Sequence, residues 1–79
     1  MFLNKNMSVV AYANGFTLWH YKSTQDSLEQ IEWAGYFDKI VTLMAIGDIV
    51  IINGKDSTEI CAVTELSPSV IIGPLSKRA

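Results

Sequence analysis

The most informative run of the sequence is Ile46-Gly47-Asp48-Ile49-Val50-Ile51-Ile52-Asn53-Gly54. Its four consecutive β-branched residues, between Gly-Asp and Asn-Gly, predict a buried strand with a turn at each end. Side chains alternate across a strand, so Ile49 and Ile51 face one way. Val50 and Ile52 face the other. Both faces are apolar, so both need cover, from the rest of the chain or from another subunit.

The composition of the chain indicates a small domain that buries surface between subunits. The 79 residues are 49% hydrophobic and 18% charged, against a usual charged share of about 25%. This length predicts one domain, residues 1–79, with a loose N-terminal arm at about residues 1–8. A small domain has much surface for its volume. Too few charges are present to cover that surface, which favours an oligomer.

The charges are unevenly distributed along the chain. The net charge is −2, and all eight acidic residues lie between Asp26 and Glu65. The bases outside that segment do not form a patch that could follow a nucleic-acid backbone, so we expect no nucleic-acid partner. Lys77 and Arg78 are interpreted as a solvated end. No run approaches the ~18 apolar residues of a membrane span, and residues 1–7 lack the apolar core of a signal peptide, so we expect no membrane partner.

The first half of the chain predicts strands followed by helix. Residues 9–12 suggest a short strand, and residues 16–21 a longer one with aromatic groups on both faces. Ser23, Thr24 and Asp26 are good helix caps, with Asp26 and Glu29 spaced as in a capping box. Residues 36–44 then allow two readings, one helix running through Gly35 or a break there. We favour the break, because a glycine in mid-helix costs about 1 kcal/mol and Asp38 offers a second cap.

The second half predicts a strand meander. A turn at residues 53–57 leads to a strand over residues 58–66, and residues 70–72 form a last strand whose end Pro74 places at a sheet edge. The fold class expected is therefore α+β, with a small antiparallel sheet or partial barrel and one or two short helices between the first and central strands. The predicted core residues are Leu28, Ile31, Phe37, Ile40, Ile49, Ile51 and Val63.

No group of residues in the sequence carries a recognisable chemistry. His20 and Cys61 are the only residues of their kinds, and no spacing joins them into a nucleophile–base pair. Cys61 is interpreted as a small buried residue in a strand, and Asp48 as part of a turn. We therefore expect no catalytic residue, no cofactor, no metal site and no enzyme activity.

Three segments carry a resemblance to a known group of proteins. They are Trp19-His20-Tyr21-Lys22-Ser23-Thr24, Ala34-Gly35-Tyr36-Phe37 and Ile46-Gly47-Asp48-Ile49. Their order resembles that of small proteins encoded by tailed bacteriophages and prophages, which share an aromatic strand, a capped helix, an Ala-Gly-Tyr-Phe turn and an apolar strand led by Gly-Asp. The resemblance covers about two-thirds of the chain and marks no catalytic residue.

The resemblance implies a virion structural protein, either a capsid decoration (cement) protein or a head-fibre or tail accessory. It would self-assemble, with a trimer favoured by analogy with cement proteins at threefold positions, and bind the major capsid or another virion protein. Its location would be the virion, after assembly in the bacterial cytoplasm. The alternative is a small phage or host regulatory module that binds another protein. The interface residues expected are Phe2, Leu3, Trp19, Tyr21, Val70, Ile71 and Ile72.

Overall fold

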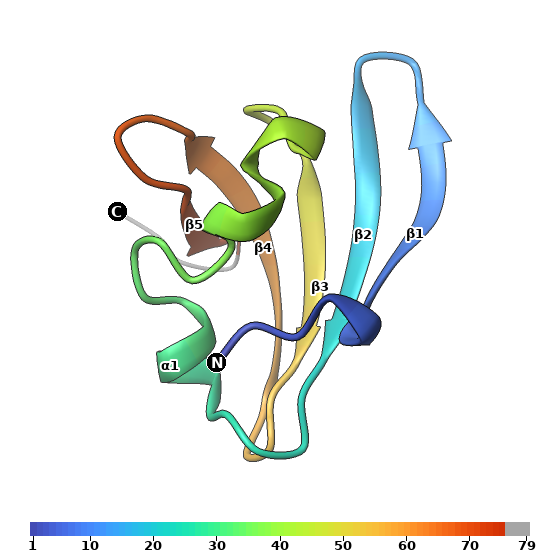
Figure 1. The fold of residues 1–79 in the computed structure, drawn as a ribbon. Coiled ribbons are helices and arrows are strands. Elements are labelled where there is room, and N and C mark those ends of the chain that lie inside the picture. The colour runs from blue at the N-terminus through green and yellow to red at the C-terminus, as the bar shows by residue number, and fades with distance from the viewer. Residues whose placement is uncertain (76–79) are drawn as a thin grey trace.

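The computed structural model describes residues 1–75, which form one five-stranded sheet and a few short helices (Figure 1). Lys77 and Arg78 lie outside the described residues. The elements in chain order are the 3-10 helix η1 (Asn4–Asn6), strands β1 (Met7–Ala13) and β2 (Phe16–Lys22), helix α1 (Leu28–Ile31), the 3-10 helix η2 (Asp38–Leu43), and strands β3 (Ile49–Asn53), β4 (Thr58–Glu65) and β5 (Ile71–Pro74). No helix within residues 1–75 is long and apolar enough to cross a membrane.

The strands lie in the order β1-β2-β3-β4-β5. Strand β2 pairs with β3 in parallel, with Leu18 opposite Ile49, and the other three pairings are antiparallel. The expectation of an antiparallel sheet or partial barrel is therefore corrected: the sheet is mixed and open, and the domain is mostly β. A parallel pair needs a crossover connection, and the segment between β2 and β3 supplies it, carrying α1 and η2.

One face of the sheet is covered by the other elements. Figure 1 shows α1, η2 and the N-terminal segment on the same side of the sheet, the side nearest the viewer. The core lies between them and the sheet, and its sheet members are Trp19, Tyr21, Val50, Ile52, Cys61, Val63 and Ile72. We call this side the inner face. Helix α1 contributes Ile31, and η2 with its flanks contributes Phe37, Ile40 and Met44.

The predicted core is confirmed in part. Ile31, Phe37, Ile40 and Val63 are buried, and Leu28 packs partly buried against them. Ile49 and Ile51 are wrong as core residues, because they point away from the helices and remain partly exposed. The alternate residues Val50 and Ile52 are both 0% exposed. The strand was predicted correctly, but the face that the helices cover was not.

The segment between β2 and β3 breaks at Gly35, as predicted, but its helices are not capped by the residues that were expected. Gly35 has a φ of +86°, which ends the first helical segment in the left-handed region. Helix α1 is capped by Ser27 in a capping box with Gln30, one residue later than expected. Asp38 begins η2 but does not cap it; its Oδ1 accepts a hydrogen bond from Val70 N over 2.8 Å and so ties η2 to the start of β5.

The N-terminal segment is part of the core. Phe2 is buried, and its ring stacks on Tyr21 with a centroid distance of 5.3 Å and meets Phe37 edge-on at 5.4 Å. The expected loose arm is thus anchored on its own chain by Phe2. The residues on either side of Phe2, Met1 and Leu3, keep exposed side chains.

Candidate interaction surface

The second face of the sheet is apolar and lies opposite the helices. Strand alternation places side chains there from β2, β3 and β4, and Leu75, which directly follows β5, lies beside them. Leu18 pairs with Ile49, Ile51 with Ile60, and Leu75 N donates to Ile60 O over 2.8 Å. We define the outer face by these residues and their neighbours on the same side: Leu18, His20, Ile49, Ile51, Ile60, Ala62 and Leu75.

The outer face is uncharged over its centre and exposes much aliphatic surface. Ile60 is 47% exposed and Leu75 is 50% exposed. Among residues 1–75, the charged residues of this face lie where the strands end. Lys22 ends β2, and Glu65 ends the oppositely directed β4, so the two charges stand at opposite ends of the face. A monomer rarely exposes so continuous an apolar patch without a binding role.

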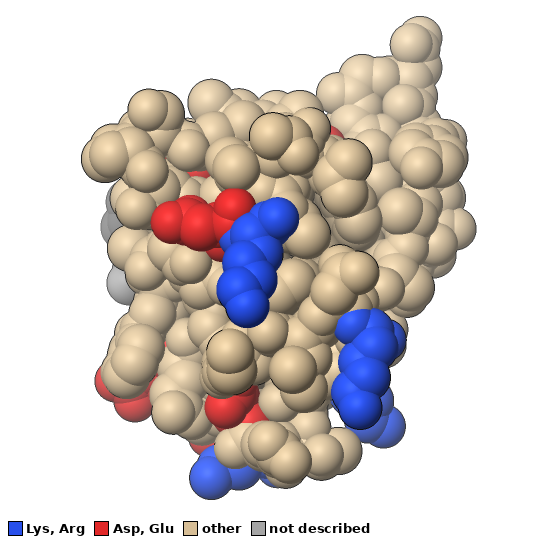
Figure 2. Space-filling model, viewed as in Figure 1, with Lys and Arg blue, Asp and Glu red and all other residues tan. Residues whose placement is uncertain are grey.

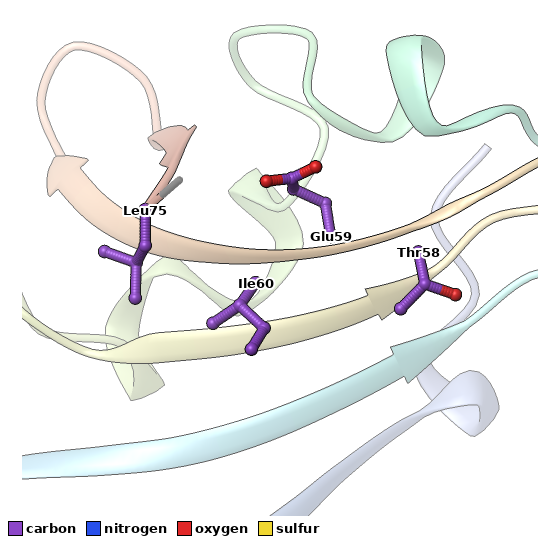
Figure 3. A pocket seen from close by; sticks show the side chains of 4 residues that line it. All are labelled: Thr58, Glu59, Ile60 and Leu75. Carbon is purple, nitrogen blue, oxygen red and sulfur yellow. The ribbon is translucent and has the colours of Figure 1, made fainter. Parts of the chain in front are cut away.

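The outer face contains an open hollow beside the end of β5. The hollow has a volume of about 590 Å³ and is lined by Thr58, Glu59, Ile60 and Leu75. It forms because β5 ends at Pro74, opposite Cys61, while β4 extends further. Figure 3 shows Ile60 and Leu75 close together, with the Glu59 carboxylate on the other side of β4. The floor of the hollow is therefore aliphatic.

His20 lies in a polar strip at one end of the outer face. Its Nε2 donates to Asn53 Oδ1 over 2.6 Å, and Asn53 Nδ2 donates to Thr58 Oγ1 over 2.7 Å. Cys61 lies on the inner face, so the sheet itself separates the two residues. A His–Cys pair is not formed, and His20 has a structural hydrogen bond.

Cys61 is a buried core residue, as expected. Its Sγ donates to Glu32 Oε2 over 3.4 Å. Burial, with the nearby Glu32 carboxylate, raises the pKa of the Cys61 thiol to about 12. The thiol therefore stays protonated near neutral pH, which is the unreactive form.

Asp48 joins three elements and is itself 1% exposed. Its Oδ1 accepts from Thr17 N, and its Oδ2 accepts from Trp19 Nε1 and Ala45 N, each over 3.0 Å. The carboxylate thus ties β2 and the end of the crossover to the start of β3. The bond from Ala45 N agrees with the interpretation of Asp48 as part of a turn. The bonds from Thr17 and Trp19 show that Asp48 also connects this turn to β2.

A chain of hydrogen bonds anchors the N-terminal segment over the inner face. Leu3 N donates to Tyr21 Oη over 3.0 Å, Tyr21 Oη donates to Tyr36 Oη over 2.9 Å, and Tyr36 Oη donates to Asp26 Oδ2 over 2.6 Å. The amino group of Met1 pairs with the same Asp26 oxygen. The hydrogen bonds from Met1 and Tyr36 lower the pKa of Asp26, and burial with the Asp26 bond raises the pKa of Tyr36.

Asp26 is expected to make stability fall in acid. A carboxyl whose pKa is lowered by folding stabilises the fold above its unfolded pKa of about 3.9, and that contribution is lost as pH falls through the lower, folded pKa. Urea unfolding of the wild type should therefore lose stability between about pH 5 and pH 2 more steeply than that of Asp26→Asn. Asp56→Asn, at an exposed cap of α1, is the matched control. An Asp26→Asn protein with the wild-type slope would contradict this role.

The predicted interface residues lie mostly in the interior. Five of the seven are buried within the chain: Phe2, Trp19, Tyr21, Val70 and Ile72. Their apolar and aromatic side chains pack against their own chain and are not available to a second molecule. Leu3 and Ile71 keep partly exposed side chains, and their part in an interface stays a prediction. The alternation of residues 58–66 was the signal that could have indicated Ile60 and Ala62 instead.

Comparison with known proteins assigns this chain to no family. No protein-family model, no curated protein and no solved structure matches the chain. Residues 1–75 contain no group of three or more His, Cys, Asp or Glu side chains arranged to hold a metal ion. The outer face is therefore the feature of the described residues from which a function can be argued.

Proposed function

We propose that the chain is a bacteriophage virion structural protein, a capsid decoration or head-fibre or tail accessory protein, which associates with itself and binds the particle. The observation that carries the proposal is the outer face, an uncharged aliphatic surface on the open side of the sheet. Such a surface is typical of a chain that is completed by other protein molecules. The resemblance of the three sequence segments supports the choice of a virion as the place of assembly.

A second apolar surface supports binding to more than one neighbour. Residues 7–21 contain no charged residue, and they form the hairpin of β1 and β2. Figure 2 shows this hairpin projecting from the molecule, with the Lys, Arg, Asp and Glu side chains of this view lying elsewhere. Val10 is 55% exposed and Tyr12 81% exposed. We call the exposed residues Val9, Val10 and Tyr12 the hairpin patch.

The hairpin patch suits contact with the particle. Strand β1 is an edge of the sheet, so its outer backbone groups are open to another strand. Tyrosine is enriched in protein interfaces, because its ring buries a large area while its hydroxyl finds a hydrogen bond. In this proposal the outer face mediates self-association, and the hairpin patch contacts another virion protein. The resemblance suggests a trimer, which competes with a pair of chains, and the mass of the chain in solution decides between the two.

Mass spectrometry of purified particles tests the proposal. Particles from the phage or prophage that encodes the chain should contain it in many copies, and they should lack a Tyr12→Lys variant that folds normally. Trp33→Lys, at an exposed aromatic residue outside both patches, should still be incorporated. Absence of the wild-type chain from pure particles would overturn the proposal and favour the regulatory protein-binding module.

A further inference from the structure

We infer that the outer face pairs with the outer face of a second copy about a twofold axis, so that two sheets form a β-sandwich. This inference rests on the self-association in the proposed function and names its surface and partner. Face-to-face sheets pack about 10 Å apart with interdigitated side chains. The outer face of one copy supplies half of such a core.

The size of the molecule allows an interface of the area that a stable dimer requires. Its accessible surface is 4948 Å², so a face that makes up one sixth of that surface would supply about 800 Å². The five strands, at a spacing of about 4.8 Å, span about 19 Å from the axis of β1 to that of β5. A standard interface buries about 800 Å² from each partner.

The charge distribution favours a second copy as the partner. Within residues 1–75 the centre of the outer face is uncharged, so these parts of two copies can meet without burying like charges. Lys22 and Glu65 stand at opposite ends of the face. If the strands of the two copies run in opposite directions, the Lys22 end of one copy lies over the Glu65 end of the other. The same arrangement occurs twice in a twofold dimer, as a self-complementary interface requires.

The shape of the outer face also selects its occupant. An extended peptide is about 5 Å wide and a helix about 10 Å wide, so either one alone would leave much of the face uncovered. A second sheet covers the whole width. The hollow between Ile60 and Leu75 then receives a side chain from the facing copy, and the twofold axis fills both hollows in the same way.

Light scattering after size-exclusion chromatography of the full chain tests the pairing. The wild type should have twice the 8.8 kDa mass of one chain. Ile60→Lys should return the mass to that of one chain, by raising the dissociation constant about 100-fold or more, because it places an unpaired charge at the centre of the interface. Ile60 is 47% exposed in the single chain, so the variant should keep the wild-type circular dichroism spectrum.

Two further variants make the result decisive. Leu75→Lys, also on the outer face, should act as Ile60→Lys does. Leu43→Lys, at an exposed residue of η2 on the opposite side of the molecule, should leave the doubled mass unchanged. If Ile60→Lys unfolds the chain, Leu75→Lys decides the question. A wild-type mass of one or three chains, or loss of the dimer in Leu43→Lys alone, would overturn the pairing.

Mass spectrometry of particles and light scattering of the chain in solution test two separate claims, and either claim can be refuted without the other. A chain that is dimeric in solution but absent from particles keeps this inference and refutes the proposed virion role. A chain found in particles with a single-chain mass in solution keeps that role and refutes the twofold pairing.

Discussion

Replacing Asp48 with alanine is expected to lower the free energy of unfolding by about 3–5 kcal/mol. The substitution removes the acceptor of three hydrogen bonds at once and leaves the donors Thr17 N, Trp19 Nε1 and Ala45 N without it. A hydrogen bond to a charged group contributes about 1.5–3 kcal/mol, and a buried donor left unpaired costs about as much again as its lost solvation. A domain of this size has only about 4–12 kcal/mol of stability.

Urea unfolding followed by circular dichroism measures this loss. Asp48→Asn keeps one side-chain oxygen as an acceptor and should lie between the wild type and Asp48→Ala. Asp56→Ala is the matched control, because the Asp56 carboxylate accepts one exposed hydrogen bond, from Leu28 N. Its loss should cost about 1 kcal/mol, the usual net contribution of one hydrogen bond. Equal losses in Asp48→Ala and Asp56→Ala would mean that Asp48 does not join the three elements.

The second large effect is expected from Ile52→Ala. Ile52 is 0% exposed on the inner face, and an isoleucine-to-alanine change at such a site costs about 2–5 kcal/mol through lost burial and the cavity that remains. The adjacent Ile51 points to the outer face and is only partly buried. Ile51→Ala should therefore cost about 1 kcal/mol in the single chain.

This pair of variants is best compared in the Ile60→Lys background, because that background removes self-association. Both substitutions delete the same atoms from neighbouring positions of one strand, so strand propensity and unfolded-state effects nearly cancel between them. Equal losses of stability, or a larger loss in Ile51→Ala, would show that the helices cover the other face of β3.

The sequence predicted the strands well and the orientation of β3 poorly. The run of β-branched residues at positions 49–52 predicts the strand from local composition alone. That run is apolar on both faces, so alternation cannot say which face the crossover covers. Only tertiary packing decides between them, through Phe2, Phe37 and the buried aromatic residues of β2. The same packing buries Trp19 and Tyr21 in the core, although the sequence had led us to expect them at an interface.

The mixed topology could have been inferred from the helical segment before β3. A long connection that carries helices is typical of parallel strands, whereas short turns join antiparallel ones. The hydrogen bonds from Asp48 to β2 could not have been inferred from the sequence. Thr17 and Trp19 lie about thirty positions away in the chain, and no spacing rule connects them to Asp48. The outer face was foreseen in part, in the expectation that both faces of β3 need cover.

The most direct test of the account is an isotope-filtered nuclear Overhauser experiment on an equal mixture of methyl-labelled and unlabelled chains. Such spectra report only contacts between different copies. The twofold pairing predicts contacts between copies for the methyl groups of Ile49, Ile51 and Ile60, and none for the buried Ile31 and Ile52. Contacts between copies that involve only Leu43, in η2 on the opposite side of the molecule, or no contacts at all, would contradict it.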